Sequence, residues 1–301
     1  MMQVCPDLEK AWFPKLIPTM NATMFKLSRP FVDKLFQAHS SNDYDFKEVE
    51  VKGIRVCIYE PIHHEKRPGI LWLHGGGYAL GKPEMDVGFI QRFVKYGCTV
   101  VLPDYTLSID APYPQALLEC YETLIWMKEN ADALGIDENK LVVGGESAGG
   151  GLCIALCLYA RDHREIKIAL QMPIYPMMDP RATNTNTNTT AYVWNALSNR
   201  QAWDLYLGKY RLQDNMPYYA APARAKSYQD MPPCISYVGT IDCFYAETKT
   251  YVERLTQEGI CTYFKEYEGC YHAFDMLVPH ANVSKDAKNF FEASFVDAMK
   301  I

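Results

Sequence analysis

The chain has 301 residues, of which 49% are hydrophobic and 22% are charged, as expected for a globular protein that buries a large core. Its formal net charge of −6 provides no overall attraction to nucleic acid or to anionic lipid. No stretch reaches the roughly 18 apolar residues that a membrane span needs, and the early acidic residues of MMQVCPDLEKAWFPKL argue against a secretory signal, so we expect a cytoplasmic protein.

The cysteines are spread through the predicted strands and helices. Cys153 and Cys157 lie four residues apart on one helix, and no second pair has the spacing of zinc ligands. We therefore expect free thiols in a reducing compartment, and no metal site.

The first 45 residues predict one or two helices of mixed character, in KAWFPKLIPTM and RPFVDKLFQ. The next stretch, FKEVEVKGIRVCIYEP, alternates across Gly53, which predicts an antiparallel hairpin. Six further strands follow, most of them separated by helical patterns: GILWLH, CTVVLP, KLVVGG, IALQMPIYP, PPCISYVG and TYFKEYEG. Repeated alternation of strands and helices predicts an α/β fold, with a mostly parallel central sheet flanked by helices.

One long segment, after the sixth predicted strand, interrupts the alternation. It contains TNTNTNTT at residues 183–190, a helical piece around residues 200–210, and many aromatic residues. We interpret residues 177–225, approximately, as an insertion that covers a site as a lid; a plain surface excursion is the alternative.

The sequence KLVVGGESAGGGLCIAL places Ser147 between a predicted strand and a predicted helix, with Gly145 and Gly149 two residues away on either side. This G-x-S-x-G spacing is typical of a serine held on a sharp strand-to-helix turn, where its hydroxyl is exposed to a substrate. A phosphate-binding loop is the alternative, but the run lacks G-x-G-x-x-G spacing and no Gly-Lys-Ser/Thr follows.

A base and an acid for this serine are expected just beyond the carboxyl ends of other strands. His272 follows the last predicted strand, and Asp242 directly follows PPCISYVGTI. Asp275 lies nearer to His272 in sequence, but within one loop it is badly placed to reach the far side of the ring. The order Ser147, Asp242, His272 is the one expected for a nucleophile on a strand-to-helix turn. His272 would accept the serine proton, and Asp242 would orient the imidazole.

The three glycines after GILWLH leave room for backbone N–H groups to approach a developing oxyanion. We predict an oxyanion site made by the N–H groups of Gly75, Gly76 and Ala148. His74, at the end of the same strand, is the other histidine that follows a strand, and Glu146 is expected to support neighbouring backbone.

These motifs together, HGGGY at residues 74–78, GESAGG at 145–150, GTID at 239–242 and HAF at 272–274, resemble the hormone-sensitive-lipase-like branch of the α/β-hydrolase fold. The resemblance extends from about residue 45 to the C-terminus. It implies an N-terminal helical cap segment at residues 1–45 and a hydrolase domain at 46–301 with the insertion at about 177–225. It also implies a carboxylesterase acting on small-molecule esters with short or medium acyl chains, without a cofactor.

One departure concerns the substrate pocket: Cys243 and Phe244 follow the acid where the family often has Pro-Leu. We expect Phe244 to reshape the acyl pocket, and Tyr78, Trp194 and Tyr206 to contribute to substrate binding. The triad itself leaves an amidase, formamidase or peptidase open, and a non-catalytic small-molecule receptor of the same fold is the alternative from another class. A homodimer that pairs through TYFKEYEG is possible.

Overall fold

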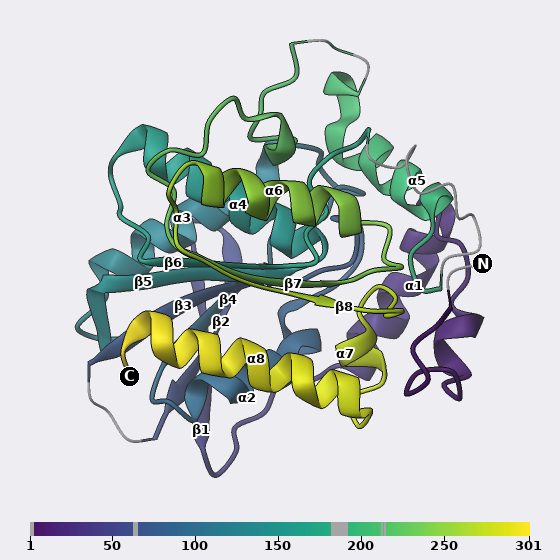
Figure 1. Cartoon of the computed structure of the whole chain (residues 1–301). Helices are drawn as coiled ribbons and strands as arrows, with labels where there is room; N and C mark the ends of the chain where they lie inside the picture. The colour runs from purple at the N-terminus through teal and green to yellow at the C-terminus, as the bar shows by residue number, and fades with distance from the viewer. Residues whose placement is uncertain (1–2, 63–65, 182–191, 212, 214) are drawn as a thin grey trace.

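The computed structural model describes residues 3–62, 66–181, 192–211, 213 and 215–301. At its centre is an eight-stranded sheet in the order β1-β2-β4-β3-β5-β6-β7-β8 (Figure 1). The strands are β1 Tyr44–Val51, β2 Ile54–Pro61, β3 Arg67–Leu73, β4 Thr99–Pro103, β5 Ile136–Glu146, β6 Leu170–Ile174, β7 Cys234–Gly239 and β8 Thr262–Tyr267. β2 runs antiparallel to both of its neighbours, β1 and β4, and the other pairs are parallel. The predicted α/β architecture is therefore confirmed.

Helices cover both faces of the sheet, so the hydrophobic core has two layers (Figure 1). The helices on one face are α3 Gln115–Glu129, α4 Ala148–His163 and α6 Tyr245–Gln257. The helices on the other face are α2 Val87–Val94, which follows the short helix η2 Pro83–Asp86, and α8 Asn282–Met299. A four-residue helix, α7 Phe274–Leu277, precedes α8. Strand β8 lies at one edge of the sheet, as the predicted homodimer requires, but the pairing itself stays a prediction.

Two segments far apart in sequence lie side by side beyond the sheet (Figure 1). One is the N-terminal segment, with η1 Phe13–Leu16 and α1 Ala22–Leu35; the other contains α5 Ala196–Leu207, followed by η4 Gly208–Tyr210 and, further along, η5 Pro222–Arg224. The backbone N–H of Met20 donates to Ser198 Oγ at 2.8 Å, and the rings of Phe25 and Trp194 lie 6.3 Å apart. We call the N-terminal segment up to residue 36 and residues 192–207, which contain helix α5, together the cap.

The helix predicted around residues 200–210 begins earlier, at Ala196, because the side chain of Asn195 caps it by accepting the N–H of Ser198. The TNTNTNTT run at residues 183–190 lies outside the described residues. The division into residues 1–45 and 46–301, and the motion of a lid, therefore stay predictions. No helix in the described part of the chain is both long enough and apolar enough to cross a membrane.

The beginning of α4 lies against the end of β3, and glycine makes this approach possible. A Cβ atom on Gly149 would lie 1.9 Å from the carbonyl oxygen of Leu73, and one on Gly145 would lie 2.5 Å from the same oxygen. Both contacts are with backbone, which cannot move aside without disturbing the sheet.

We expect Gly149→Ala to lower the free energy of unfolding by about 3 kcal/mol or more, because the added methyl overlaps a strand carbonyl. Gly88→Ala is the matched control, since a Cβ on Gly88 in α2 meets nothing within 4 Å. The control should be neutral or stabilising by up to about 1 kcal/mol. Urea unfolding measures both, and equal midpoints for the two variants would contradict the packing argument.

Candidate active site

Ser147 stands on a strained turn between β5 and α4. Its backbone has φ 56° and ψ −118°, a region that residues with a side chain rarely adopt. Hydrogen bonds hold this conformation: the Ser147 N–H donates to Ile174 O at 2.9 Å, and its carbonyl accepts the N–H groups of Gly151 and Met177 at 3.0 and 2.8 Å. The hydroxyl is thereby fixed beyond the carboxyl ends of the parallel strands.

The structure brings Ser147, His272 and Asp242 together in one hydrogen-bonded chain. His272 Nε2 lies 2.9 Å from Ser147 Oγ, and His272 Nδ1 lies 2.8 Å from Asp242 Oδ2. The other carboxylate oxygen, Oδ1, accepts the N–H of Phe244 at 2.9 Å. All three side chains are buried, with exposed fractions of 6% for Ser147, 5% for His272 and 1% for Asp242.

Aromatic rings fix the orientation of the His272 imidazole. Tyr175 and Phe244 pack edge-on against it, with ring centroids at 5.0 and 5.1 Å. Asp275, the acid that sequence reasoning set aside, instead accepts the hydroxyls of Tyr175 and Tyr237 at 3.1 and 2.7 Å. The carboxylate that contacts His272 is therefore the one from the end of β7.

Gly75 was predicted to contribute to an oxyanion site, and that role stays a prediction, but its N–H has an acceptor within the protein. It donates to the side chain of Glu146, the residue that precedes Ser147. In the described part of the chain, by contrast, no acceptor receives the N–H groups of Gly76, Gly77 or Ala148. Ala148 begins α4, where the first N–H groups of a helix have no intrahelical partner. The free donors next to Ser147 thus come from Gly76, Gly77 and Ala148.

Glu146 supports the loop after β3 as expected, and it does so together with an acid that the sequence did not reveal. The buried carboxyl groups of Glu146 and Asp86, the last residue of η2, interact with each other. Such a pair is disfavoured when both groups are ionised, and we infer that they share a proton. Asp86 also accepts the indole N–H of Trp72 at 3.0 Å. Burial raises the pKa of Asp86 to about 7, and burial and the neighbouring Asp86 hold the pKa of Glu146 well above its ordinary value.

His74 belongs to the support of the same loop. Its ring is buried and stacks on Tyr105, with centroids 4.3 Å apart, and its Nδ1 lies 2.8 Å from Gly75 O. Burial lowers the pKa of His74, which keeps the imidazole neutral. The structure therefore places His74 beneath the loop and away from the hydrogen-bonded chain of Ser147.

The four residues expected to bind substrate are all buried. Tyr78 and Tyr206 stack on each other at 3.8 Å between centroids, and the hydroxyl of Tyr78 donates to Met177 O at 2.9 Å. Trp194, on the cap, lies closer to the site, with its ring 6.5 Å from that of His272, and Phe244 packs on the same imidazole. Contact with a substrate stays a prediction for each of them, and the geometry favours Phe244 and Trp194.

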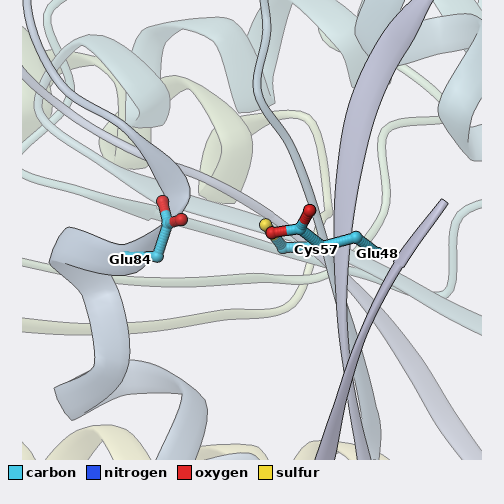
Figure 2. A group of neighbouring side chains, drawn as sticks. All are labelled: Glu48, Cys57 and Glu84. Carbon is cyan, nitrogen blue, oxygen red and sulfur yellow. The ribbon is translucent and has the colours of Figure 1, made fainter. Parts of the chain in front are cut away.

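Among the described residues, one group has the donor atoms and spacing of a metal site: Glu48, Cys57 and Glu84 (Figure 2). Arg55 already neutralises its carboxylates, donating to Glu48 at 2.7 Å and to both oxygens of Glu84 at 2.9 and 3.0 Å. Burial raises the pKa of the Cys57 thiol to about 12, so the thiolate that binds metals is not formed near neutral pH. This group is an ion-pair network centred on Arg55.

The acid pair generates a prediction about pH and stability. Unfolded Asp86 ionises near its ordinary pKa of 3.8, whereas the folded protein keeps its proton up to about pH 7. The folded state thus binds more protons between these values, and stability falls as the pH rises through them. The substitution Asp86→Asn should remove this pH-dependent loss of stability. The amide still offers an oxygen to the Trp72 N–H and an N–H group to the Glu146 carboxylate.

We therefore expect the free energy of unfolding of Asp86→Asn, relative to the wild type, to rise with pH between 3.8 and about 7 and to level off above. Urea unfolding at a series of pH values measures this difference. A difference that stays constant across the range would contradict the shared proton.

Comparison with known proteins agrees with this geometry. Residues 70–276 match the family model for the alpha/beta hydrolase fold. An arylesterase of Saccharolobus solfataricus is 30% identical over 234 residues, which cover 75% of this chain and 74% of that protein. An AB hydrolase superfamily protein of Schizosaccharomyces pombe is 30% identical over 244 residues, covering 76% of this chain and 70% of that protein.

A solved structure of a bacterial heroin esterase superimposes with a TM-score of 0.90 and 25% sequence identity, covering 99% of this chain and 98% of that one. The family resemblance drawn from the motifs is thus confirmed. The chain belongs to the α/β-hydrolase fold family, among relatives that are esterases.

Proposed function

We propose that the protein is a serine carboxylesterase in which Ser147 is the nucleophile, His272 the general base and acid, and Asp242 the orienting carboxylate. The observation that carries this proposal is the hydrogen-bonded chain from Ser147 Oγ through both nitrogens of His272 to Asp242. The names of the relatives, an arylesterase and a heroin esterase, support the ester bond as the target.

The reaction follows from these contacts. His272 Nε2 accepts the Ser147 proton as Oγ attacks the ester carbonyl, and the resulting imidazolium then protonates the leaving alcohol. Water attacks the acyl-enzyme in a second round, with His272 again as the base. Asp242 accepts the Nδ1–H, which selects the tautomer whose Nε2 faces the serine.

Negative charge on the carbonyl oxygen would be stabilised by the N–H groups of Gly76, Gly77 and Ala148. Two features support this set over the one that contains Gly75: these donors have no acceptor among the described residues, and the N–H of Gly75 is bound to Glu146. The bond to Glu146 also holds the loop in place, so the donors need no reorganisation when the charge develops.

The substrate we propose is a small-molecule ester with a short or medium acyl chain. Phe244 and Trp194 present aromatic rings beside His272, which favours an apolar group next to the reacting carbonyl. An amide bond is the second possibility, because the same nucleophile and oxyanion donors serve both reactions.

We expect the wild type to hydrolyse p-nitrophenyl esters between acetate and laurate, with a maximum at short or medium chain length, and Ser147→Ala to lose this activity. Release of p-nitrophenolate measures both proteins. Folded wild type that is inactive on every ester but cleaves p-nitroanilides would favour the amidase reading, and binding without turnover would favour a receptor.

We expect Asp242→Asn to lower kcat by roughly four orders of magnitude, because the amide no longer selects the correct imidazole tautomer. Asp275→Asn is the control, since that carboxylate is buried near the site but bonds two tyrosines instead of His272. Steady-state kinetics, with circular dichroism to confirm folding, compare the two variants. Equal losses would contradict the assignment of Asp242 as the orienting acid.

A further inference from the structure

The outer surface of the cap carries an unusual concentration of exposed apolar side chains. Nine large hydrophobic side chains are exposed in the described part of the chain, and the two outside the cap, Ile62 and Leu118, are 43% and 38% exposed. The seven on the cap are each 53% to 69% exposed: Trp12, Phe13, Leu16, Leu27, Phe31, Leu35 and Leu197. Single exposed apolar residues are ordinary, but a group of this size on one part of a molecule marks an interaction surface.

Helix α1 shows how this surface is built. Leu27, Phe31 and Leu35 follow one another at intervals of four residues and therefore form one stripe along the helix. Phe25 and Val32 are buried on another side of the helix, packed on the core. Helix α1 thus has a second apolar face, which is exposed instead of packed against the rest of the protein. We call the seven exposed cap residues the cap surface.

Positive charge accompanies the cap surface. Residues 3–36 contain five basic and three acidic side chains, a small positive excess in a chain that has 30 basic and 36 acidic residues overall. One of the five, Arg29, is paired with Asp110 at 2.6 Å, so the unpaired positive charge comes from lysines. Lys34 lies three residues after Phe31, on the same stripe, and Lys26 directly precedes Leu27. Lys10 and Lys15 flank Trp12 and Phe13 in the same way, and all four lysines are exposed.

We propose that the cap surface docks the protein onto an anionic lipid surface. Exposed Trp, Phe and Leu beside lysines are the features of an element that lies in the membrane interface, with its apolar side chains among the acyl chains and its charges at the headgroups. A second copy of this chain fits less well. A two-fold interface places the same patch against itself, and the lysines of the two copies would face each other.

The docking also places the proposed active site toward the lipid, a step that rests on the proposed esterase function. A hollow of about 370 Å³ is lined by Leu8, Pro14 and Lys15 of the N-terminal segment and by Tyr192 and Tyr271. Pro14 is buried and Lys15 is exposed, both between Phe13 and Leu16 of the cap surface, and Tyr271 directly precedes His272. The hollow therefore lies beside the N-terminal segment, and one of its lining residues adjoins His272 along the chain. We expect esters dissolved in the membrane to approach from this side.

The test is sedimentation with sucrose-loaded vesicles of phosphatidylcholine, with and without phosphatidylglycerol, using Ser147→Ala so that binding is measured without turnover. We expect binding that requires phosphatidylglycerol and weakens with added salt. The triple variant Leu27→Ser, Phe31→Ser, Leu35→Ser should lower the partition coefficient at least about tenfold. Lys34→Gln alone should lower it about fivefold.

Leu118→Ser, an exposed leucine on α3 outside the cap, is the matched control and should bind like the parent. Hydrolysis of p-nitrophenyl acetate in solution should be equal in the triple variant and the wild type, so loss of docking and loss of catalysis are separate readouts. Absence of binding to phosphatidylglycerol vesicles, or equal binding of the triple variant, would overturn the proposal. So would a dimer, detected by light scattering, that the triple variant converts to a monomer.

Discussion

The close approach between the first turn of α4 and the carboxyl end of β3 is the constraint on which the site depends. Because Gly145 and Gly149 carry no side chain, the two backbones meet at the carbonyl of Leu73. The chain between these glycines must then turn within very few residues, and Ser147 takes the positive φ that such a turn demands. The same approach brings the loop after β3 next to Ser147, so one packing contact positions both the proposed nucleophile and the N–H groups that we propose as its oxyanion donors.

The cap and the site are coupled through aromatic packing. Trp194 touches Phe25 of α1 on one side and approaches His272 on the other. A Cβ on Gly77 would lie 2.4 Å from the Trp194 ring, so the cap also fits closely over the loop of the proposed oxyanion donors. The position of the cap therefore bears on the shape of the space that a substrate occupies.

Much of this arrangement could be predicted from the sequence, because the informative residues stand at strand ends. Ser147 and Asp242 follow buried apolar strands and His272 follows the edge strand β8, and the topology of a parallel sheet brings the ends of such strands to one side of it. The fold followed from the same alternation of strands and helices. In each case the spacing of residues along the chain was enough to predict the feature.

What the sequence could not show depends on side-chain direction. The bond from Gly75 to Glu146 selects which glycines of HGGG remain free, and nothing in a run of three identical residues distinguishes them. Asp86 is separated from Glu146 by sixty residues and lies in a short helix without a motif. Tyr78 and Tyr206 were expected at the substrate, and the sequence did not show that they stack on each other, with Tyr206 on helix α5 of the cap.

The acid pair has a consequence for the electrostatics of the site. Glu146 lies one residue from Ser147, and a fully ionised pair with Asp86 would place two negative charges close to the oxygen that becomes anionic during ester cleavage. The raised pKa values of both carboxyl groups reduce that charge. Glu146 can therefore hold the N–H of Gly75 and anchor the loop after β3. Because the pair carries less negative charge than two ionised carboxylates, it repels the negative charge of the proposed transition state less strongly.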